Sequence, residues 1–148
     1  MGTHYKGTRE EVLALNAFIK MMRAAESVSA RLNRYLMEEG LTLSQFGTLE
    51  SLYHLGPLCQ RELGAKQLKS SGNITMVVDN LEKRGLVARK RDTLDRRFVT
   101  VHLTPKGKRL IRDLFPRHLV NIVGEMKFLT ETEQKQLDHL CKKVGLRK

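Results

Sequence analysis

The sequence predicts a mainly α-helical (α+β) fold in which one β-hairpin lies among the helices. Apolar residues recur at spacings of three and four along most of the chain, which is the pattern of amphipathic helices. Strand-like alternation is confined to one pair of segments, 86–91 and 97–103. The 148 residues contain no internal repeat, and this length is typical of one domain. We therefore expect residues 1–148 to form a single domain.

The longest predicted helix covers residues 8–39, and Gly40 suits its end. A helix of this length extends beyond the core of a small domain, so we expect part of it to face another subunit. Steps of three and four give it the a/d pattern of a coiled coil. The residues in this pattern are Leu15, Phe18, Met22, Ala25, Ser29, Leu32 and Leu36.

Three shorter helices are predicted next. Thr42–Gln45 is a capping box, and the helix that it opens ends at Gly56. A second helix is expected over residues 59–68, followed by a break at 70–72. The third covers residues 71–84 and has a polar, uncharged outer face. Its apolar stripe consists of Ile74, Val77, Val78 and Leu81.

Residues 86–103 predict a hairpin with a basic tip. Seven lysines and arginines lie within residues 83–97, against the two carboxylates of Asp92 and Asp95. A hairpin turn needs only a Gly or an Asn, so this much charge indicates a polyanionic partner. The order of three short helices and a charged hairpin, within residues 42–104, is that of a winged helix-turn-helix.

In this arrangement residues 71–84 are the recognition helix and residues 86–103 are the wing. Thr104-Pro105 then opens a helix in which Pro116 predicts a kink, and Thr130–Glu133 is a second capping box before a terminal helix. The net charge of +11 favours nucleic acid over a membrane surface as the partner. No apolar run approaches ~18 residues, so no membrane span is expected.

The segment NITMVVDNLEKRGLVARKRDTLDRRFVTVHLTPKG resembles the signature of the MarR family, the multiple-antibiotic-resistance-type regulators. The most specific parts are VVDNLEKRGLV and the Asp-x-Arg wing that precedes LTPKG. The resemblance implies a homodimer, with residues 8–39 and 105–148 as dimerisation helices. It also implies binding to pseudo-palindromic double-stranded DNA by a transcriptional regulator, usually a repressor, and not an enzyme.

The resemblance also assigns roles to residues of the wing. Arg97 matches the arginine that enters the minor groove, Asp95 matches the aspartate that orients it, and Arg96 suits a phosphate contact. Arg89 and Arg91, on the strand stem, suit phosphates as well. The residues expected to approach bases or phosphates from the recognition helix are Ser70, Ser71, Asn73, Thr75 and Met76. By chemistry, Asn73 suits adenine and Met76 a thymine methyl group.

The signal that releases DNA is left open by the sequence. Family members often respond to small phenolic or lipophilic compounds, and others respond to thiol oxidation. Cys59 is a candidate redox residue, because a helix N-terminus and the nearby Arg61 favour a thiolate. The peroxide-sensing branch instead carries its cysteine on the first helix, which has none here. Cys141 lies on an apolar stripe and is expected in the core.

Other functions have weaker support. The two cysteines form no CxxC pair, which fits a reducing cytoplasm, and the five histidines show no metal-ligand spacing, so neither a metal site nor a cofactor is expected. A winged-helix protein- or RNA-interaction module is one alternative. A thiol enzyme with Cys59 and His54 is another, but it lacks a third group to orient the base. A small-molecule pocket is expected near Phe18, Met22, Tyr53, His54 and His118.

Overall fold

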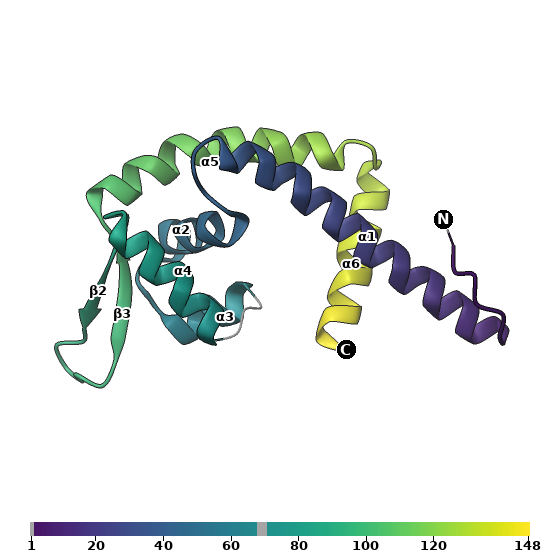
Figure 1. The fold of residues 1–148 in the computed structure, drawn as a ribbon, viewed down its shortest axis with the longest axis horizontal. Helices are drawn as coiled ribbons and strands as arrows, with labels where there is room; N and C mark the ends of the chain where they lie inside the picture. The colour runs from purple at the N-terminus through teal and green to yellow at the C-terminus, as the bar shows by residue number, and fades with distance from the viewer. Residues whose placement is uncertain (1, 68–70) are drawn as a thin grey trace.

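The computed structural model describes residues 2–67 and 71–148, and its elements follow the predicted order (Figure 1). Six helices and a three-stranded sheet make up this part of the chain. The elements are α1 (Arg9–Met37), α2 (Leu43–Leu55), β1 (Leu58–Cys59), α3 (Gln60–Gln67), α4 (Ser71–Lys83), β2 (Val87–Arg91), β3 (Val99–Leu103), α5 (Pro105–Met126) and α6 (Glu131–Leu146). The predicted mainly helical winged helix-turn-helix fold is confirmed.

Threonine caps fix where the helices begin. Both predicted capping boxes are present, at Thr42 with Gln45 and at Thr130 with Glu133. Thr8 forms a third one at the start of α1. Thr104 accepts a hydrogen bond from the Gly107 amide at 3.0 Å, just before the proline at the first position of α5. Of the break predicted at 70–72, residues 71 and 72 belong to α4, and residue 70 lies outside the described residues.

The sheet has the order β1-β3-β2 with antiparallel pairing, so the wing strand β3 is central. Strand β1 was not predicted, because two residues give no alternating pattern and Cys59 was assigned to a helix. Leu58 pairs with Val101 and Cys59 with Thr100, which ties the wing to the start of α3.

The core lies among α2, α4, α5 and the inner face of the sheet. The predicted stripe of α4 is confirmed for Ile74, Val78 and Leu81, which are buried, while Val77 is half-buried. Phe46 from α2 is the largest fully buried side chain of the core. These contacts leave the opposite side of α4 directed outward, beside the wing (Figure 1).

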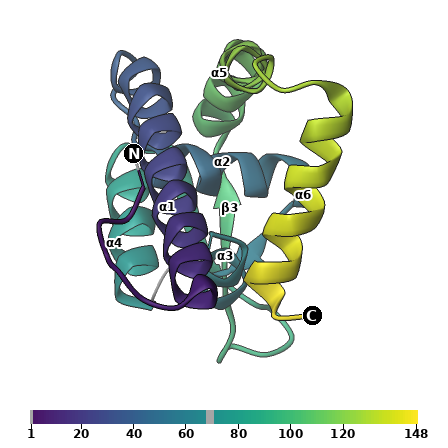
Figure 2. The same cartoon turned by 90° about the vertical axis from the view of Figure 1, so that its right-hand side faces the viewer.

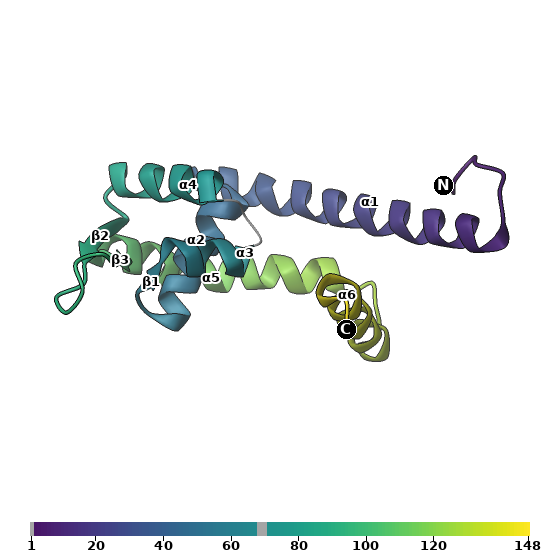
Figure 3. The same ribbon diagram turned by 90° about the horizontal axis from the view of Figure 1, so that it is seen from below.

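Most of α1, the C-terminal part of α5 and the whole of α6 extend away from this core (Figures 2 and 3). Only Leu32 and Leu36 of α1 are buried, and α6 has no buried residue. Cys141 is therefore exposed, and its predicted place in the core is wrong for the single chain. Helix α5 continues through Pro116. None of the helices within residues 2–67 and 71–148 combines the length and apolar character that a bilayer span requires.

Candidate nucleic-acid interface

The outer side of α4 borders a shallow hollow together with the N-terminal turn of α2. The hollow has a volume of about 310 Å³. Met76 is 65% exposed there, and none of the described residues that line the hollow is charged. It is lined by Thr42, Ser44, Gln45, Asn73, Met76, Val77 and Asn80. Amides, hydroxyls and a thioether in one place can read base edges by hydrogen bonds and methyl contacts.

The wing tip is a turn held by a short aspartate side chain. Asp92 accepts hydrogen bonds from the amides of Leu94, at 2.7 Å, and Asp95, at 3.3 Å. The turn is closed by the Asp92 amide, which donates to the Phe98 carbonyl at 2.9 Å. Leu94 is 97% exposed, so the tip projects from the body. Asp92 thus forms an Asx turn, in which its carboxylate accepts hydrogen bonds from the backbone amides that follow it.

Asp95 holds Arg97 at this tip. The Arg97 Nη2 atom donates to Asp95 Oδ2 at 2.8 Å, and Nε donates to Oδ1 at 3.1 Å, while the Arg97 amide also donates to Oδ1. The Arg97 side chain is nonetheless 88% exposed. The Arg97 side chain lowers the pKa of the Asp95 carboxyl, and Asp95 raises the pKa of Arg97, so both stay charged at neutral pH. A fixed, exposed guanidinium is suited to the narrow minor groove.

The other three wing arginines differ in their surroundings. Arg96 is exposed, and Arg91 is exposed as well, while its Nη1 atom donates to the Arg96 carbonyl at 3.0 Å. Arg89 instead faces the protein. Its side chain is 23% exposed and forms ion pairs with Asp79 and Glu82 of α4. The stem arginines Arg89 and Arg91 are therefore not equivalent, although a phosphate contact was predicted for both.

The predicted recognition residues lie at the start of α4. Asn73, Thr75 and Met76 are exposed. Thr75 Oγ1 accepts a hydrogen bond from Gln60 Nε2 at 3.0 Å. Ser71 begins the helix, and Ser70 lies outside the described residues.

Sequence reasoning missed four residues of this region: Gln60, Asp79, Glu82 and Asp92. A signal existed for two of them, because Asp79 and Glu82 are three residues apart and so share a face of α4. The Asp92 turn also follows a recognised pattern. Gln60 carries no signal, since its partners are distant in sequence.

Cys59 lies at the N-terminal end of α3, as expected, and is half-buried. Its amide donates to Glu62 Oε2 at 2.8 Å, and hydrogen bonds from Cys59 lower the pKa of the Glu62 carboxyl. A carboxylate beside the sulfur is the opposite of the cationic surroundings of reactive cysteines. This contact weakens the redox interpretation. In the described residues, no group of three or more His, Cys, Asp or Glu side chains could hold a metal ion.

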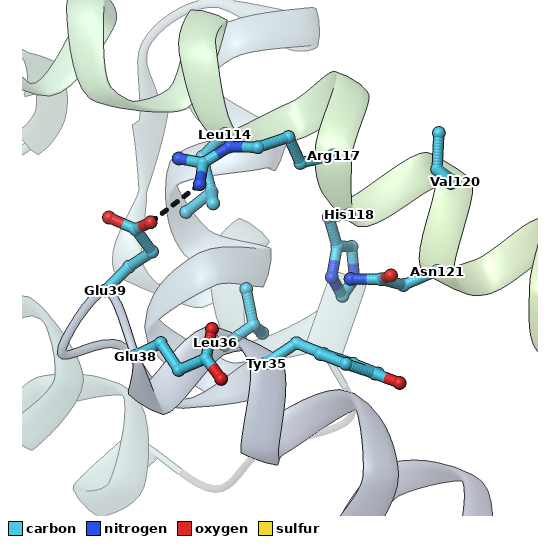
Figure 4. A pocket seen from close by; sticks show the side chains of 9 residues that line it. All are labelled: Tyr35, Leu36, Glu38, Glu39, Leu114, Arg117, His118, Val120 and Asn121. Atoms are coloured by element: carbon cyan, nitrogen blue, oxygen red, sulfur yellow. Dashed lines mark hydrogen bonds and ion pairs between the residues drawn. The ribbon is translucent and has the colours of Figure 1, made fainter.

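A pocket of about 350 Å³ lies between the C-terminal end of α1 and the middle of α5 (Figure 4). Arg117 Nη1 pairs with Glu39 Oε1 at 2.8 Å across it. Of the five residues expected near a pocket, His118 is in this lining and the other four are not. The lining residues are Tyr35, Leu36, Glu38, Glu39, Leu114, Arg117, His118, Val120 and Asn121.

His118 is the unusual member of this lining. It is 4% exposed, its ring packs on Phe46 with 4.1 Å between centroids, and its Nδ1 atom has no hydrogen-bond partner in the described residues. Burial lowers the pKa of His118, so the imidazole is neutral at physiological pH. A buried polar atom without a partner is rare and costs folding free energy.

The lowered pKa of this histidine predicts that the stability of the protein depends on pH. Between pH 6.5, where the unfolded histidine titrates, and the lower pKa of folded His118, the unfolded state binds more protons. The free energy of unfolding should therefore fall as the pH drops below about 6.5. Urea unfolding from pH 8 to pH 5.5 checks this. The variant His118→Phe should lose less stability over that range. If the free energies of unfolding of the two proteins fell equally with pH, His118 would not be the cause of the pH dependence.

Comparisons with known proteins agree with this geometry. Residues 41–99 match the model of the MarR family. The chain is 38% identical over 133 residues to the HTH-type transcriptional regulator MhqR of Bacillus subtilis (strain 168), covering 90% of this chain and 92% of the relative.

Two solved structures are similar over most of their length. A mutant MarR from E. coli complexed with operator DNA has a TM-score of 0.75 and 27% identity, covering 94% of this chain and 99% of the other. CouR from Rhodococcus jostii RHA1, bound to p-coumaroyl-CoA, has a TM-score of 0.79 and 25% identity, covering 89% and 93%. The fold, the helix-wing arrangement and these likenesses lead to one assignment: the chain belongs to the MarR family of DNA-binding transcriptional regulators.

Proposed function

We propose that the protein is a homodimeric repressor that binds a pseudo-palindromic operator. Two copies of α4 would enter successive major grooves, and two wings would place Arg97 in the flanking minor grooves. The observation that carries this proposal is the exposed Arg97, fixed by Asp95 beside the outward side of α4. The family is one of transcriptional regulators rather than enzymes, so the thiol-enzyme alternative is set aside.

The homodimer is supported by apolar side chains that a single chain leaves exposed. They lie on α1, α5 and α6 and on the loop between the last two helices, all at the end of the molecule away from the wing (Figure 1). Exposed apolar surface of this extent marks an interface. The residues are Leu13, Phe18, Met21, Met22, Leu119, Val120, Val123, Phe128, Leu137, Leu140, Val144 and Leu146.

On the operator, we assign the contacts by chemistry and position. Arg91 and Arg96 would bind phosphates beside the minor groove that takes Arg97. Asn73 and Met76 would contact base edges from the hollow beside α4, with Thr75 next to them. Ser70 and Ser71, which precede these residues, remain assigned to base or phosphate contacts at the same end of the helix.

The salt dependence of binding tests this function. A dimer that neutralises ~6–10 phosphates should give a log–log salt slope steeper than about −5 on a specific duplex. Fluorescence anisotropy with a labelled duplex, at salt concentrations from about 50 to about 300 mM, measures the slope. A scrambled duplex is the control. A shallow slope, or equal affinity for both duplexes, would contradict the proposal, and the latter would favour the alternative of a protein- or RNA-interaction module.

We further propose that a small lipophilic or phenolic compound releases the operator by binding in the pocket of His118. The pocket is partly apolar and joins α1, on the proposed dimer side, to α5, which packs against α2 in the DNA-binding region. Neutral His118 can accept a hydrogen bond from a phenol or donate one to a carbonyl or carboxylate. Filling the pocket would then change how α5 packs on Phe46 of α2.

Calorimetry with a panel of phenols and aromatic acids tests the ligand. A phenol that binds should lose about tenfold in affinity in His118→Phe, because the hydrogen bond to a buried partner is lost. The same compound without its hydroxyl group should bind both proteins equally. If a phenol that releases DNA binds His118→Phe as tightly as the wild type, the pocket is not the effector site.

A further inference from the structure

Arg89 connects three elements at the base of the wing. It belongs to β2, and its Nη2 atom donates to Asp79 Oδ1 at 2.5 Å while Nη1 donates to Glu82 Oε1 at 2.9 Å, both on α4. Its Nε atom donates to Gln60 Oε1 at 3.1 Å, at the start of α3. The Arg89 amide also donates to Glu82 Oε2 at 3.0 Å. All three guanidinium nitrogens are thus bound within the protein.

The charges of this cluster argue against a phosphate contact by Arg89. One arginine and two carboxylates carry a net charge of −1, in a region where a polyanion is expected to bind. Carboxylates near a bound duplex would repel its phosphates. An arginine whose N–H groups point at Asp79 and Glu82 would have to break both ion pairs to reach a phosphate.

The cluster also extends to the outer side of the recognition helix. Gln60 receives the Arg89 hydrogen bond on its oxygen and donates from its nitrogen to Thr75 Oγ1 at 3.0 Å. A path of hydrogen bonds therefore runs from the wing stem through α3 to Thr75. Because the guanidinium is planar, its fork fixes the direction of each bond, which an ammonium group cannot do.

We propose that Arg89 is a positioning residue that sets the angle between the wing and the recognition helix, with Asp79, Glu82 and Gln60 as its partners. This inference rests on the proposed function, since the angle matters only if both elements bind one duplex. It assigns the acidic residues Asp79 and Glu82 a role in favour of DNA binding, contrary to their charge.

The first test measures the wing itself and needs no DNA. The chain has no tryptophan, so Phe98→Trp, at an exposed position beside β3, introduces a single fluorophore. In that background Arg89→Lys keeps the positive charge but replaces the planar guanidinium, with its several N–H donors, by an ammonium group. Time-resolved anisotropy should show a larger amplitude of fast wing motion, while circular dichroism should show a melting temperature within a few degrees of the parent.

The second test measures binding to the specific duplex as a function of salt. Arg89→Lys, and separately Asp79→Asn with Glu82→Gln, should each weaken binding about tenfold, with the salt slope of the wild type. The matched control Asp113→Asn removes one carboxylate from an exposed site on α5 and should not weaken binding.

The outcomes separate the proposals. If neutralising Asp79 and Glu82 tightens binding, or if Arg89→Lys changes neither wing motion nor affinity, the positioning role is wrong. If Arg89 contacted a phosphate directly, the log–log salt slope of Arg89→Met would be shallower than that of the wild type by about 2 per dimer. That result would also overturn the inference. If the wild type binds no duplex specifically, the proposed function fails, and wing motion alone decides whether Arg89 anchors the wing.

Discussion

Replacing Arg97 by alanine should weaken binding to the specific duplex by at least about 30-fold. An arginine that contacts base edges or a groove contributes about 1–3 kcal/mol, and a dimer places two on each duplex. The sum of about 2–6 kcal/mol corresponds to this loss or a larger one. The fold should be unaffected, because the Arg97 side chain is 88% exposed and, among the described residues, its hydrogen bonds are made to Asp95. Anisotropy titrations at one salt concentration measure the effect.

The matched control is Arg112→Ala, which removes the same charge from an exposed position on α5. Its affinity should stay within about threefold of the wild type, since exposed charges distant from the duplex are screened. Asp95→Asn makes the protein more positive, yet it should weaken binding because Arg97 loses its support. Equal losses in Arg97→Ala and Arg112→Ala would mean that only net charge matters.

Gly107→Ala should destabilise the protein by about 3 kcal/mol, the upper range for added volume in a packed site. A Cβ atom at this position would overlap the carbonyl oxygen of Leu86 and lie 2.9 Å from its carbonyl carbon. That carbonyl cannot retreat easily, because it accepts a hydrogen bond from the Thr104 amide at 3.1 Å. The melting temperature should fall by roughly 6–12 °C.

Gly124→Ala is the control on the same helix. No atom lies within 4 Å of its added Cβ, so alanine should leave stability unchanged or raise it by up to about 1 kcal/mol through helix propensity. The two variants have the same chemical change and opposite expected signs. A melting temperature of Gly107→Ala within about two degrees of the wild type would correspond to less than about 1 kcal/mol. It would show that the backbone of Leu86 yields to the added methyl group.

The sequence predicted those features that local chemistry decides. Thr42, Thr130 and Thr104 begin helices because their side chains bond the first amides of the same segment. The apolar stripe of α4 was predicted because its residues recur at the spacings of three and four that a helix requires. The wing was found because its two strands alternate and are close in sequence.

Features that depend on distant partners were not predicted. The inward direction of Arg89 requires acceptors from α3 and α4, and no local pattern separates it from the exposed Arg91. The exposure of Cys141 depends on whether α6 packs within its own chain, which an apolar stripe does not reveal. The unpartnered Nδ1 of His118 likewise follows only from the packing of α5 on α2.

Selection of duplexes from a random library, followed by sequencing, tests the central proposal most directly. Two protomers that each present one α4 and one wing to the same double helix should enrich a motif with two-fold symmetry. Its halves should be centred about one helical turn apart, with A·T-rich flanks where Arg97 would lie. Enrichment of a single asymmetric half-site, or no enrichment above the starting library, would contradict it.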